Sequence, residues 1–469
     1  MTILSNFLFI TFFYLVCLLT ITNAEVIDSL PGQPSKNVSF KQHSGYIVTD
    51  DDHGRALFYY FAEAQSKNKL SLPLTLWLGG AFGCTSLGIG VFLEHGPFRL
   101  SKHDKLIKNE YSWNLESNML YVDTPIGAGF SYSNTSSDYA VWDEPKSAND
   151  NMKFLLKWFD KFPQYRKQDF YIAGDAFGGH LAPQLAAVIL EYNANSHGKP
   201  PIKLKGIALG NPVLDIKYSL SYVENLWYRG AISEETFHMQ KTLCSMGTYF
   251  TELALGNVTK QCNKMIEILN NEVGDINMDN MLSPPCLSTE YVGNEARDTS
   301  ITDPCIDEKL DTYMNNPQVQ RALHANSTGL PYSWNMYCEG GTDYEHLEMF
   351  AHDVIPTVSA LLKRHIRVML YSGDQDLMVA VTQTRKIASK LARDLKLNTL
   401  HNNRPWYNGK QIGGWSQTYG RLKKGKAVIQ LTFATVKGGG NYVPYSSPSE
   451  ALILFKAFLK GSPPPTGPS

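Results

Sequence analysis

The segment that decides the fold reads YIAGDAFGG and occupies residues 171–179. Its first half is an apolar run typical of a buried strand, and the apolar residues that follow at 181–192 indicate a helix. Glycines on both sides of Ala176 permit a sharp turn between strand and helix, as in the G-x-S-x-G nucleophile elbow, which lifts one side chain above the sheet edge. That side chain is a methyl group here. On this segment alone, an ordinary tight turn is an equal alternative.

The chain around this segment alternates strand and helix patterns, which indicates a mainly parallel sheet covered on both faces. Strands are expected at residues 72–78, 118–122, 169–174, 202–209, 366–371 and 427–436, and helices at about 148–162, 181–192 and 450–459. The alternation is lost at about 215–331, which predicts a mainly helical insertion held by local disulfides. The tail at 461–469 is rich in Pro, Gly and Ser, a composition typical of disorder. We therefore expect a single α/β domain at 25–469.

The N-terminus has the pattern of a secretory signal peptide at residues 1–24, with cleavage after Ala24. Its apolar run of about 13 residues is shorter than the ~20 that a spanning helix needs, and no later stretch reaches that length. These features predict a protein of the secretory pathway, either secreted or delivered to a vacuolar or lysosomal lumen.

The cysteines and sequons agree with an oxidising compartment. Six cysteines outside the signal segment predict three disulfides, with 15 possible connectivities, among Cys84, Cys244, Cys262, Cys286, Cys305 and Cys338. Four sequons predict glycosylation at Asn37, Asn134, Asn257 and Asn326. No C-x-x-C pair suggests zinc, so we expect neither a metal nor a cofactor. The formal net charge of −1 gives no excess of positive charge with which to bind nucleic acid, so we expect no nucleic-acid partner.

Several further segments carry a family resemblance. Residues 77–87 read WLGGAFGCTSL and are followed by EHGPF at 94–98, while residues 174–183 read GDAFGGHLAP. Near the C-terminus stand YSGDQD at 371–376 and VKGGGNYVP at 436–444. These segments resemble the W-L-N-G-G-P-G-C-S-S-L, E-x-G-P-F and G-E-S-Y-x-G-x-Y-x-P signatures of the serine carboxypeptidases, most closely the plant-type members. The resemblance implies an α/β-hydrolase fold, with a mostly parallel central sheet flanked by helices.

The resemblance also implies the positions of a serine, aspartate and histidine triad. The nucleophile falls on Ala176, the acid on Asp376 and the base on Asn441, so only the acid is retained. Alanine has no nucleophilic atom, and an asparagine amide cannot carry the proton that imidazole transfers. Loss of the serine or the histidine from such a triad lowers turnover roughly a millionfold.

The neighbouring positions that the family uses for binding have changed as well. The implied oxyanion hole consists of the main-chain N–H groups of Ala81 and Phe177, in a loop that includes Gly80. The family holds the substrate's terminal carboxylate with an asparagine and two glutamates, which correspond here to Gly79, Asp175 and Glu94. Only the last is retained, so recognition of a peptide C-terminus should weaken. Four polar residues beside these motifs are expected to be structural, namely Ser86, His95, Ser131 and His180.

The sequence therefore favours a secreted carboxypeptidase-like protein that has lost catalysis and binds a peptide, a small acyl ligand or another protein. One alternative is a hydrolase or acyltransferase with residual or rerouted activity, which requires a nucleophile that the sequence does not reveal. Another is a structural or regulatory partner that forms a homodimer, or a heterodimer with an active paralogue.

Overall fold

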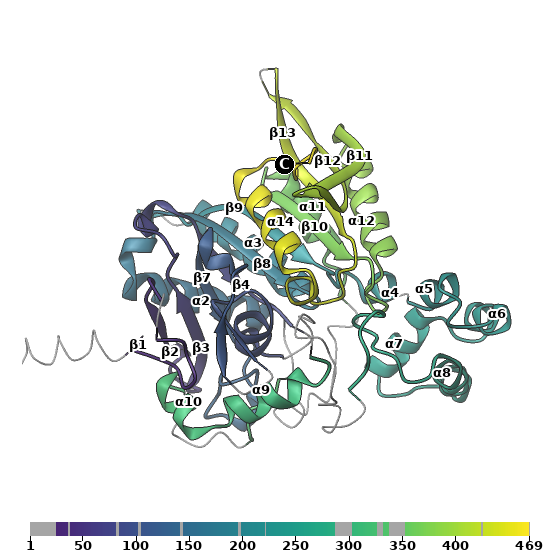
Figure 1. Ribbon diagram of the computed structural model, residues 1–469, viewed down its shortest axis with the longest axis horizontal. Helices are drawn as coiled ribbons and strands as arrows, with labels where there is room; N and C mark the ends of the chain where they lie inside the picture. The colour runs from purple at the N-terminus through teal and green to yellow at the C-terminus, as the bar shows by residue number, and fades with distance from the viewer. Residues whose placement is uncertain are drawn as a thin grey trace, which may run out of the picture.

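The computed structural model describes residues 25–35, 38–80, 84–101, 105–140, 144–195, 198–220, 222–286, 303–325, 332–336, 352–423 and 425–468. Its main sheet has eleven strands in the order β1-β2-β3-β7-β4-β8-β9-β10-β13-β12-β11 (Figure 1). The strands are β1 (Val26–Ile27), β2 (Gln42–Asp50), β3 (Arg55–Ala62), β4 (Leu74–Trp77), β7 (Asn118–Val122), β8 (Asp169–Asp175), β9 (Lys203–Gly210), β10 (Arg367–Gly373), β11 (Asn398–Asn408), β12 (Gln411–Lys423) and β13 (Lys426–Val436). A separate small sheet pairs β5 (Phe98–Leu100) with β6 (Leu106–Lys108).

The centre of the main sheet is parallel. Strands β7, β4, β8, β9, β10 and β13 pair in parallel, whereas the strands at both edges pair antiparallel. This arrangement confirms the predicted α/β-hydrolase class with a mostly parallel central sheet. It also brings the carboxyl ends of β8, β9, β10 and β13 to one edge of the sheet, where ligands bind in open α/β folds.

Helices cover both faces of the sheet, and each face has its own core. One core joins the sheet to α2 (Glu144–Lys161), α3 (Gly178–Asn195), α11 (Ile355–Lys363) and α12 (Val381–Asp394). The other joins it to η2 (Leu87–Glu94), α9 (Ile306–Met314) and α14 (Pro448–Lys460). Because side chains alternate along a strand, Leu76 faces the first core and Trp77 the second. The remaining short helices are η1 (Lys69–Ser71), η3 (Trp113–Leu115), η4 (Ser136–Tyr139), η5 (Pro163–Tyr165), α10 (Pro317–Ala322) and α13 (Val443–Ser446).

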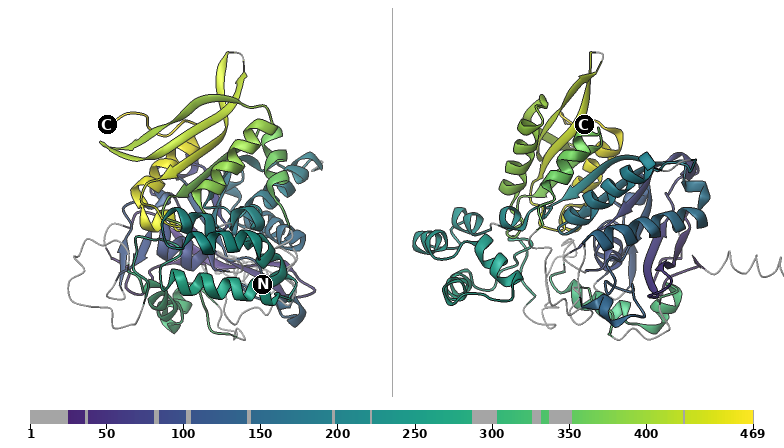
Figure 2. Two further views of the ribbon diagram at one scale, coloured as in Figure 1. Left: turned by 90° about the vertical axis from the view of Figure 1, so that its right-hand side faces the viewer. Right: turned by 180° about the vertical axis from the view of Figure 1, so that it is seen from behind.

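A group of helices between β9 and the returning sheet stands to one side of the sheet (Figure 2). It contains α4 (Ile216–Ser219), α5 (Val223–Tyr228), α6 (Glu234–Thr242), α7 (Met246–Ala254) and α8 (Lys260–Val273), and most of these helices share a small core of their own. Disulfides join Cys244 to Cys262 and Cys286 to Cys305. The predicted helical, disulfide-held insertion is therefore present. Cys84 is buried, whereas Cys338 lies outside the described residues, so the third disulfide stays a prediction.

The structure can also be compared with the predicted tail, glycosylation sites and membrane-spanning segments. In the tail that the composition predicts to be disordered, Pro464 is buried and the Pro465 carbonyl accepts a hydrogen bond from the Tyr407 N–H at 3.0 Å. Asn134 and Asn257 are exposed, as glycosylation requires. Asn37, Asn326 and the signal segment lie outside the described residues. Within the part of the chain that the structure describes, no helix combines the length and the apolar character needed to cross a bilayer.

The disulfide inside the insertion core yields a stability prediction. Cys244 and Cys262 are 18 residues apart, and closing a loop of that size stabilises a fold by about 3 kcal/mol. The paired change Cys244→Ser and Cys262→Ser should therefore lower the free energy of unfolding of the insertion by about that amount. Urea denaturation followed by tryptophan fluorescence measures the change, and an unchanged midpoint would show that the helices do not depend on the bridge.

Candidate functional site

The turn after β8 has the geometry of a nucleophile elbow. Ala176 adopts a φ of 43°, its N–H donates to the Gly210 carbonyl at 3.0 Å, and its own carbonyl accepts from Val213 N–H at 2.8 Å. A Cβ at Gly174 or at Gly178 would overlap with the Leu78 carbonyl, so neither position admits a side chain. The Ala176 methyl group is partly exposed and can be reached from outside.

Because the backbone at Ala176 is left-handed, we expect substitution by glycine at this position to stabilise the protein. An L-residue other than glycine loses roughly 1–2 kcal/mol in this region, and glycine's larger unfolded-state entropy offsets part of that gain. Ala176→Gly should therefore raise the free energy of unfolding by about 0.5–1 kcal/mol. The matched control Ala182→Gly, in the first half of α3, should lower it by about 1 kcal/mol. Chemical denaturation compares the two, and a loss of stability in both would mean that the turn is unstrained.

The carboxyl group of Asp376, in the turn after β10, accepts four hydrogen bonds. Its Oδ1 accepts from the N–H groups of Met378 and Val379 at 2.8 and 3.0 Å. Its Oδ2 accepts from Nδ2 of Asn211 at 2.6 Å and from Nδ2 of Asn441 at 2.8 Å. Burial outweighs these bonds and raises the pKa of Asp376 to about 6. The structure thus brings together the acid and base positions that the resemblance assigns.

Asn441 is fixed at both its main chain and its side chain. Its N–H donates to the Asp279 carbonyl at 2.7 Å, and its amide nitrogen donates to Asp376 as described. A neutral amide group donates through nitrogen and accepts through oxygen, and it does not bind a proton at any accessible pH. The arrangement therefore reproduces the hydrogen bond from base to acid but supplies no proton acceptor.

The main-chain donor expected in an oxyanion hole is already bonded. Phe177 N–H donates to the Gly80 carbonyl at 3.1 Å. Ala81, the other expected donor, lies outside the described residues. A substrate oxygen would have to displace the Gly80 carbonyl before Phe177 could stabilise it, so this conformation offers weak oxyanion stabilisation.

Asp175 and Glu94 form a buried pair of carboxyl groups. Asp175 Oδ1 accepts from Gly80 N–H at 2.7 Å, whereas Asp175 Oδ2 and both carboxyl oxygens of Glu94 have no hydrogen-bond partner among the described residues. Burial raises the pKa of Asp175 to about 7, although the hydrogen bond from Gly80 N–H lowers it in part. Burial and then repulsion from Asp175 raise the pKa of Glu94 well above its usual range.

Gly79 cannot accept the side chain that the family carries without a rearrangement. A Cβ at this position would overlap with Trp77 Nε1 and lie 2.5 Å from Asp175 Oδ1. Trp77 in turn packs edge-on against His95 and Trp113, with ring centroids 4.2 and 5.5 Å away. The position of Trp77, fixed by these rings, therefore leaves no room at Gly79 for the asparagine side chain that the family carries.

The other polar residues beside the motifs have structural partners. Ser86 Oγ accepts from Gly79 N–H at 3.2 Å. Ser131 Oγ accepts from Phe58 N–H at 2.8 Å and donates to the Asp123 carbonyl at 2.6 Å. His95 and His180 are buried, and their Nδ1 atoms lie 3.0 Å from Tyr121 Oη and 3.1 Å from Glu144 Oε1. These contacts support the structural roles expected from the sequence.

The structure adds Asn211 and Asp279 to the site. Asn211 follows β9 at the carboxyl edge of the sheet, a position at which it could have been expected from the strand pattern. Asp279 belongs to a segment that runs beside the acid turn, since Leu377 N–H donates to the Met278 carbonyl at 3.0 Å and Met281 N–H donates to the Gln375 carbonyl at 3.1 Å. No periodicity or motif in the irregular insertion indicates this approach.

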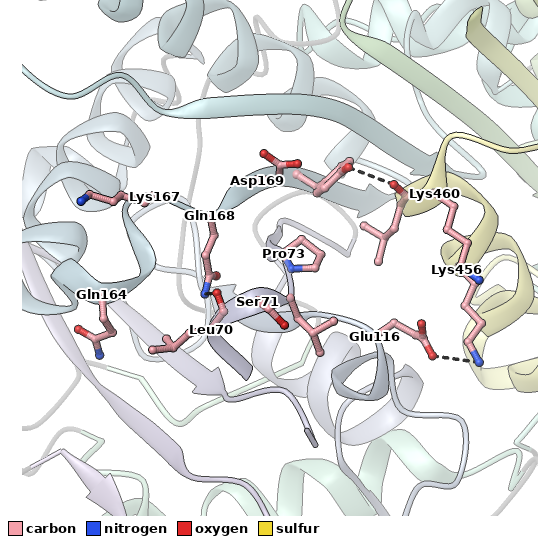
Figure 3. Close-up of a pocket in the computed structure, with 13 residues that line it drawn as sticks. Leu70, Ser71, Pro73, Glu116, Gln164, Lys167, Gln168, Asp169, Lys456 and Lys460 are labelled. Carbon is pink, nitrogen blue, oxygen red and sulfur yellow. Dashed lines mark hydrogen bonds and ion pairs between the residues drawn. The ribbon is translucent and has the colours of Figure 1, made fainter. Parts of the chain in front are cut away.

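A separate pocket of about 510 Å³ lies at the opposite end of β8 (Figure 3). Its lining includes Asp169 at the start of that strand and Lys456 on α14, which pairs with Glu116 at 3.0 Å. This is the amino end of the parallel strands, away from the edge where α/β sheets bind ligands. The described residues contain no group of three His, Cys, Asp or Glu side chains arranged to hold a metal ion.

Comparisons with known proteins agree with this geometry. The family model for serine carboxypeptidases matches residues 31–461. Serine carboxypeptidase-like 45 of Arabidopsis thaliana is 40% identical over 455 residues, covering 95% of this chain and 94% of that protein, and serine carboxypeptidase 24 of the same plant is 38% identical over 451 residues, covering 93% and 92%. The structure of KEX1(Δ)P, a prohormone-processing carboxypeptidase from Saccharomyces cerevisiae, superimposes with a TM-score of 0.72 at 20% identity, covering 94% of this chain and 95% of that one.

Proposed function

Because the chain belongs to the serine carboxypeptidase family, we propose that it is a non-catalytic member that binds a ligand at the former catalytic centre. The ligand classes that fit this proposal are a peptide, a small acyl compound or a segment of another protein. We further propose that the protein works in a secretory compartment, a proposal that the two disulfides support.

One observation carries the loss of catalysis, namely the contact between Asn441 and Asp376. The amide occupies the hydrogen bond that a catalytic imidazole would make, so the turn is built around a group that cannot accept a proton. With a methyl group at Ala176, both the nucleophile and its base are absent from the elbow. Removing either group from a triad raises the barrier by about 8 kcal/mol, and removing both adds little because they act as a unit.

The surrounding structure supports a retained binding role. Asp376 keeps four hydrogen bonds, and Ala176 keeps a strained backbone that an ordinary turn would not need. A rerouted hydrolase would need another nucleophile near the elbow. Ser86 and Ser131 are both buried and hydrogen-bonded, which makes either one a poor substitute.

Labelling with a fluorophosphonate probe tests this proposal. The folded wild-type protein should form no covalent adduct, while an active plant serine carboxypeptidase treated in parallel should label fully. A cooperative thermal transition serves as the check on folding. An adduct mapped by mass spectrometry to any serine near the elbow would overturn the proposal.

A further inference from the structure

We propose that the projecting end of the β12–β13 hairpin binds a linear polysaccharide that carries carboxylate groups. Four exposed cations form this surface, which we call the basic tip, namely Lys396, Arg421, Lys423 and Lys426. The basic tip lies at the amino end of β13, whereas the former catalytic centre lies at the carboxyl ends of the parallel strands. The inference rests on the proposed secretory compartment and not on the loss of catalysis.

The charge of this region differs from that of the whole chain. Residues 395–449 contain eight Lys and Arg residues and none of the 44 Asp and Glu residues. The formal net charge of −1 therefore hides a separation of charge, with this region basic and the rest of the chain acidic. Charged residues on exposed strands also oppose aggregation, but glutamate serves that purpose too. A field of one sign is suited to the attraction of an anionic partner.

The pairing of β11, β12 and β13 brings the four cations together. Lys423 is directly opposite Lys426 in the register of β12 and β13. A guanidinium nitrogen of Arg421 donates to the Leu395 carbonyl at 3.2 Å, which places this side chain beside the turn that contains Lys396. The hairpin extends beyond the helices that cover the sheet, so the basic tip is open to a large ligand (Figures 1 and 2).

No ion pair among the described residues neutralises the basic tip. The neighbouring acid Asp394 pairs instead with Lys390 at 2.6 Å. Like charges directly opposite each other across an antiparallel pair destabilise that pair. The fold therefore holds Lys423 and Lys426 together at a cost in stability, which an anionic ligand bound to both would offset.

The side chains beside the basic tip suit a sugar polymer. The indole ring of Trp415, on β12, is 38% exposed and offers a flat apolar surface to a sugar ring. Amide and hydroxyl groups, which can donate to and accept from sugar hydroxyls, follow the tip along the edge strand β11. These exposed residues are Asn398, Thr399, Asn402 and Asn403.

An anionic membrane is the main competing partner, since Leu422 and Val428 are exposed at the tip. They lie on opposite faces of the hairpin, because Leu422 is opposite Ala427 and Val428 is opposite Arg421 in consecutive pairs of the register. The tip therefore lacks the continuous apolar face that a membrane-bound segment buries. Anionic lipids also concentrate in the cytoplasmic leaflet, which a protein of a secretory compartment does not meet.

Binding of polygalacturonate to the intact protein tests the inference. Fully methyl-esterified polygalacturonate is the matched control ligand, because it has the same backbone without the charges. Isothermal titration calorimetry should detect binding of the first polymer and none of the second. A rise from about 50 to about 200 mM NaCl should weaken the binding on the order of tenfold, because salt screens exposed charges.

Two variants separate binding from folding. Lys423→Gln with Lys426→Gln should weaken the binding by about tenfold or more, while the thermal midpoint should stay the same or rise because the repulsion between the two lysines is removed. Lys426→Glu should raise the thermal midpoint by creating a cross-strand pair of opposite charge, yet it should also weaken the binding. The matched control Lys153→Gln with Lys264→Gln removes two exposed charges from α2 and α8 and should leave the binding unchanged.

Equal binding of the methyl-esterified polymer, or no binding of polygalacturonate, would overturn the inference. Full affinity in Lys423→Gln with Lys426→Gln, or an equal loss in the control variant, would overturn it as well. Tighter binding to vesicles of phosphatidylserine and phosphatidylcholine than to polygalacturonate would overturn it in favour of a membrane. None of these results alters the fluorophosphonate experiment, so failure of the basic tip is distinguishable from failure of the proposed function.

Discussion

The double variant Ala176→Ser with Asn441→His should react with a fluorophosphonate probe at least about a thousandfold faster than either single variant. The elbow already has the backbone that presents a side chain above the sheet, with a φ of 43° at position 176. An imidazole at position 441 would lie beside Asp376 Oδ2, where the Asn441 amide donates now at 2.8 Å. The other three hydrogen bonds keep the Asp376 carboxyl group in place. The new serine and histidine would therefore meet an acid and an elbow that are already positioned.

The two single variants are the matched controls, and both should remain unlabelled. A hydroxyl at position 176 would face an amide that cannot remove its proton, and a histidine at position 441 would face a methyl group. Peptide hydrolysis by the double variant should stay far below its reactivity toward the probe, because Phe177 N–H is bonded to Gly80 and the carboxylate grip at Gly79 is missing. Labelling of Ala176→Ser alone, or efficient release of C-terminal residues by the double variant, would contradict this account.

The protein should be more stable at about pH 5 than at about pH 8, by about 3 kcal/mol or more in the free energy of unfolding. Burial raises the pKa values of Asp123 and Asp376 to about 6 and those of Asp175 and Asp279 to about 7. Between the unfolded value of 3.8 and these folded values, the native state binds protons that the unfolded chain has released, so stability falls as the pH rises. The whole shift of Asp376 corresponds to about 3 kcal/mol, of which about half falls between about pH 5 and 8, and the other three carboxyl groups add to it.

Buried histidines oppose this trend over part of the range. Burial lowers the pKa values of His43 and His95, so below about pH 6.5 the unfolded chain binds protons that the native state does not. These two residues therefore make the free energy of unfolding rise as the pH increases to about 6.5. The steepest loss of stability should therefore fall between about pH 6.5 and 7.5, where only the carboxyl groups still titrate. Chemical denaturation across this range measures it. Asp175→Asn should flatten the profile and the exposed Asp51→Asn should not, whereas stability that increases from about pH 5 to 8 would contradict the prediction.

The sequence predicts the centre of this fold better than its edges. The strands around YIAGDAFGG are short apolar runs, so β4, β7, β8 and β9 appear where the pattern places them. The antiparallel β11 and β12 were not predicted because their polar, partly exposed residues lack a regular alternation. The tail composition indicates disorder, but the pairing of Tyr407 with Pro465 is a contact with a distant strand that composition cannot reveal.

The candidate site was predictable where a motif fixes the position. The contact of Asn441 with Asp376 follows from matching two motifs that lie 65 residues apart. The approach of Asp279 depends instead on how the insertion folds back onto the acid turn. The bond from Phe177 N–H to Gly80 depends on loop conformation, and neither arrangement leaves a pattern in the sequence.

The most direct test of the central claim compares peptide hydrolysis by purified wild-type protein and by Asp376→Asn. Asp376 is the retained member of the triad positions, so any turnover through this site should depend on it. Asn441→Ala, which removes one donor to the same carboxylate, provides a second comparison in case Asp376→Asn does not fold. We predict that the wild-type protein and the folded variants release C-terminal residues at the same background rate. Turnover by the wild-type protein that is lost in these variants would contradict the account.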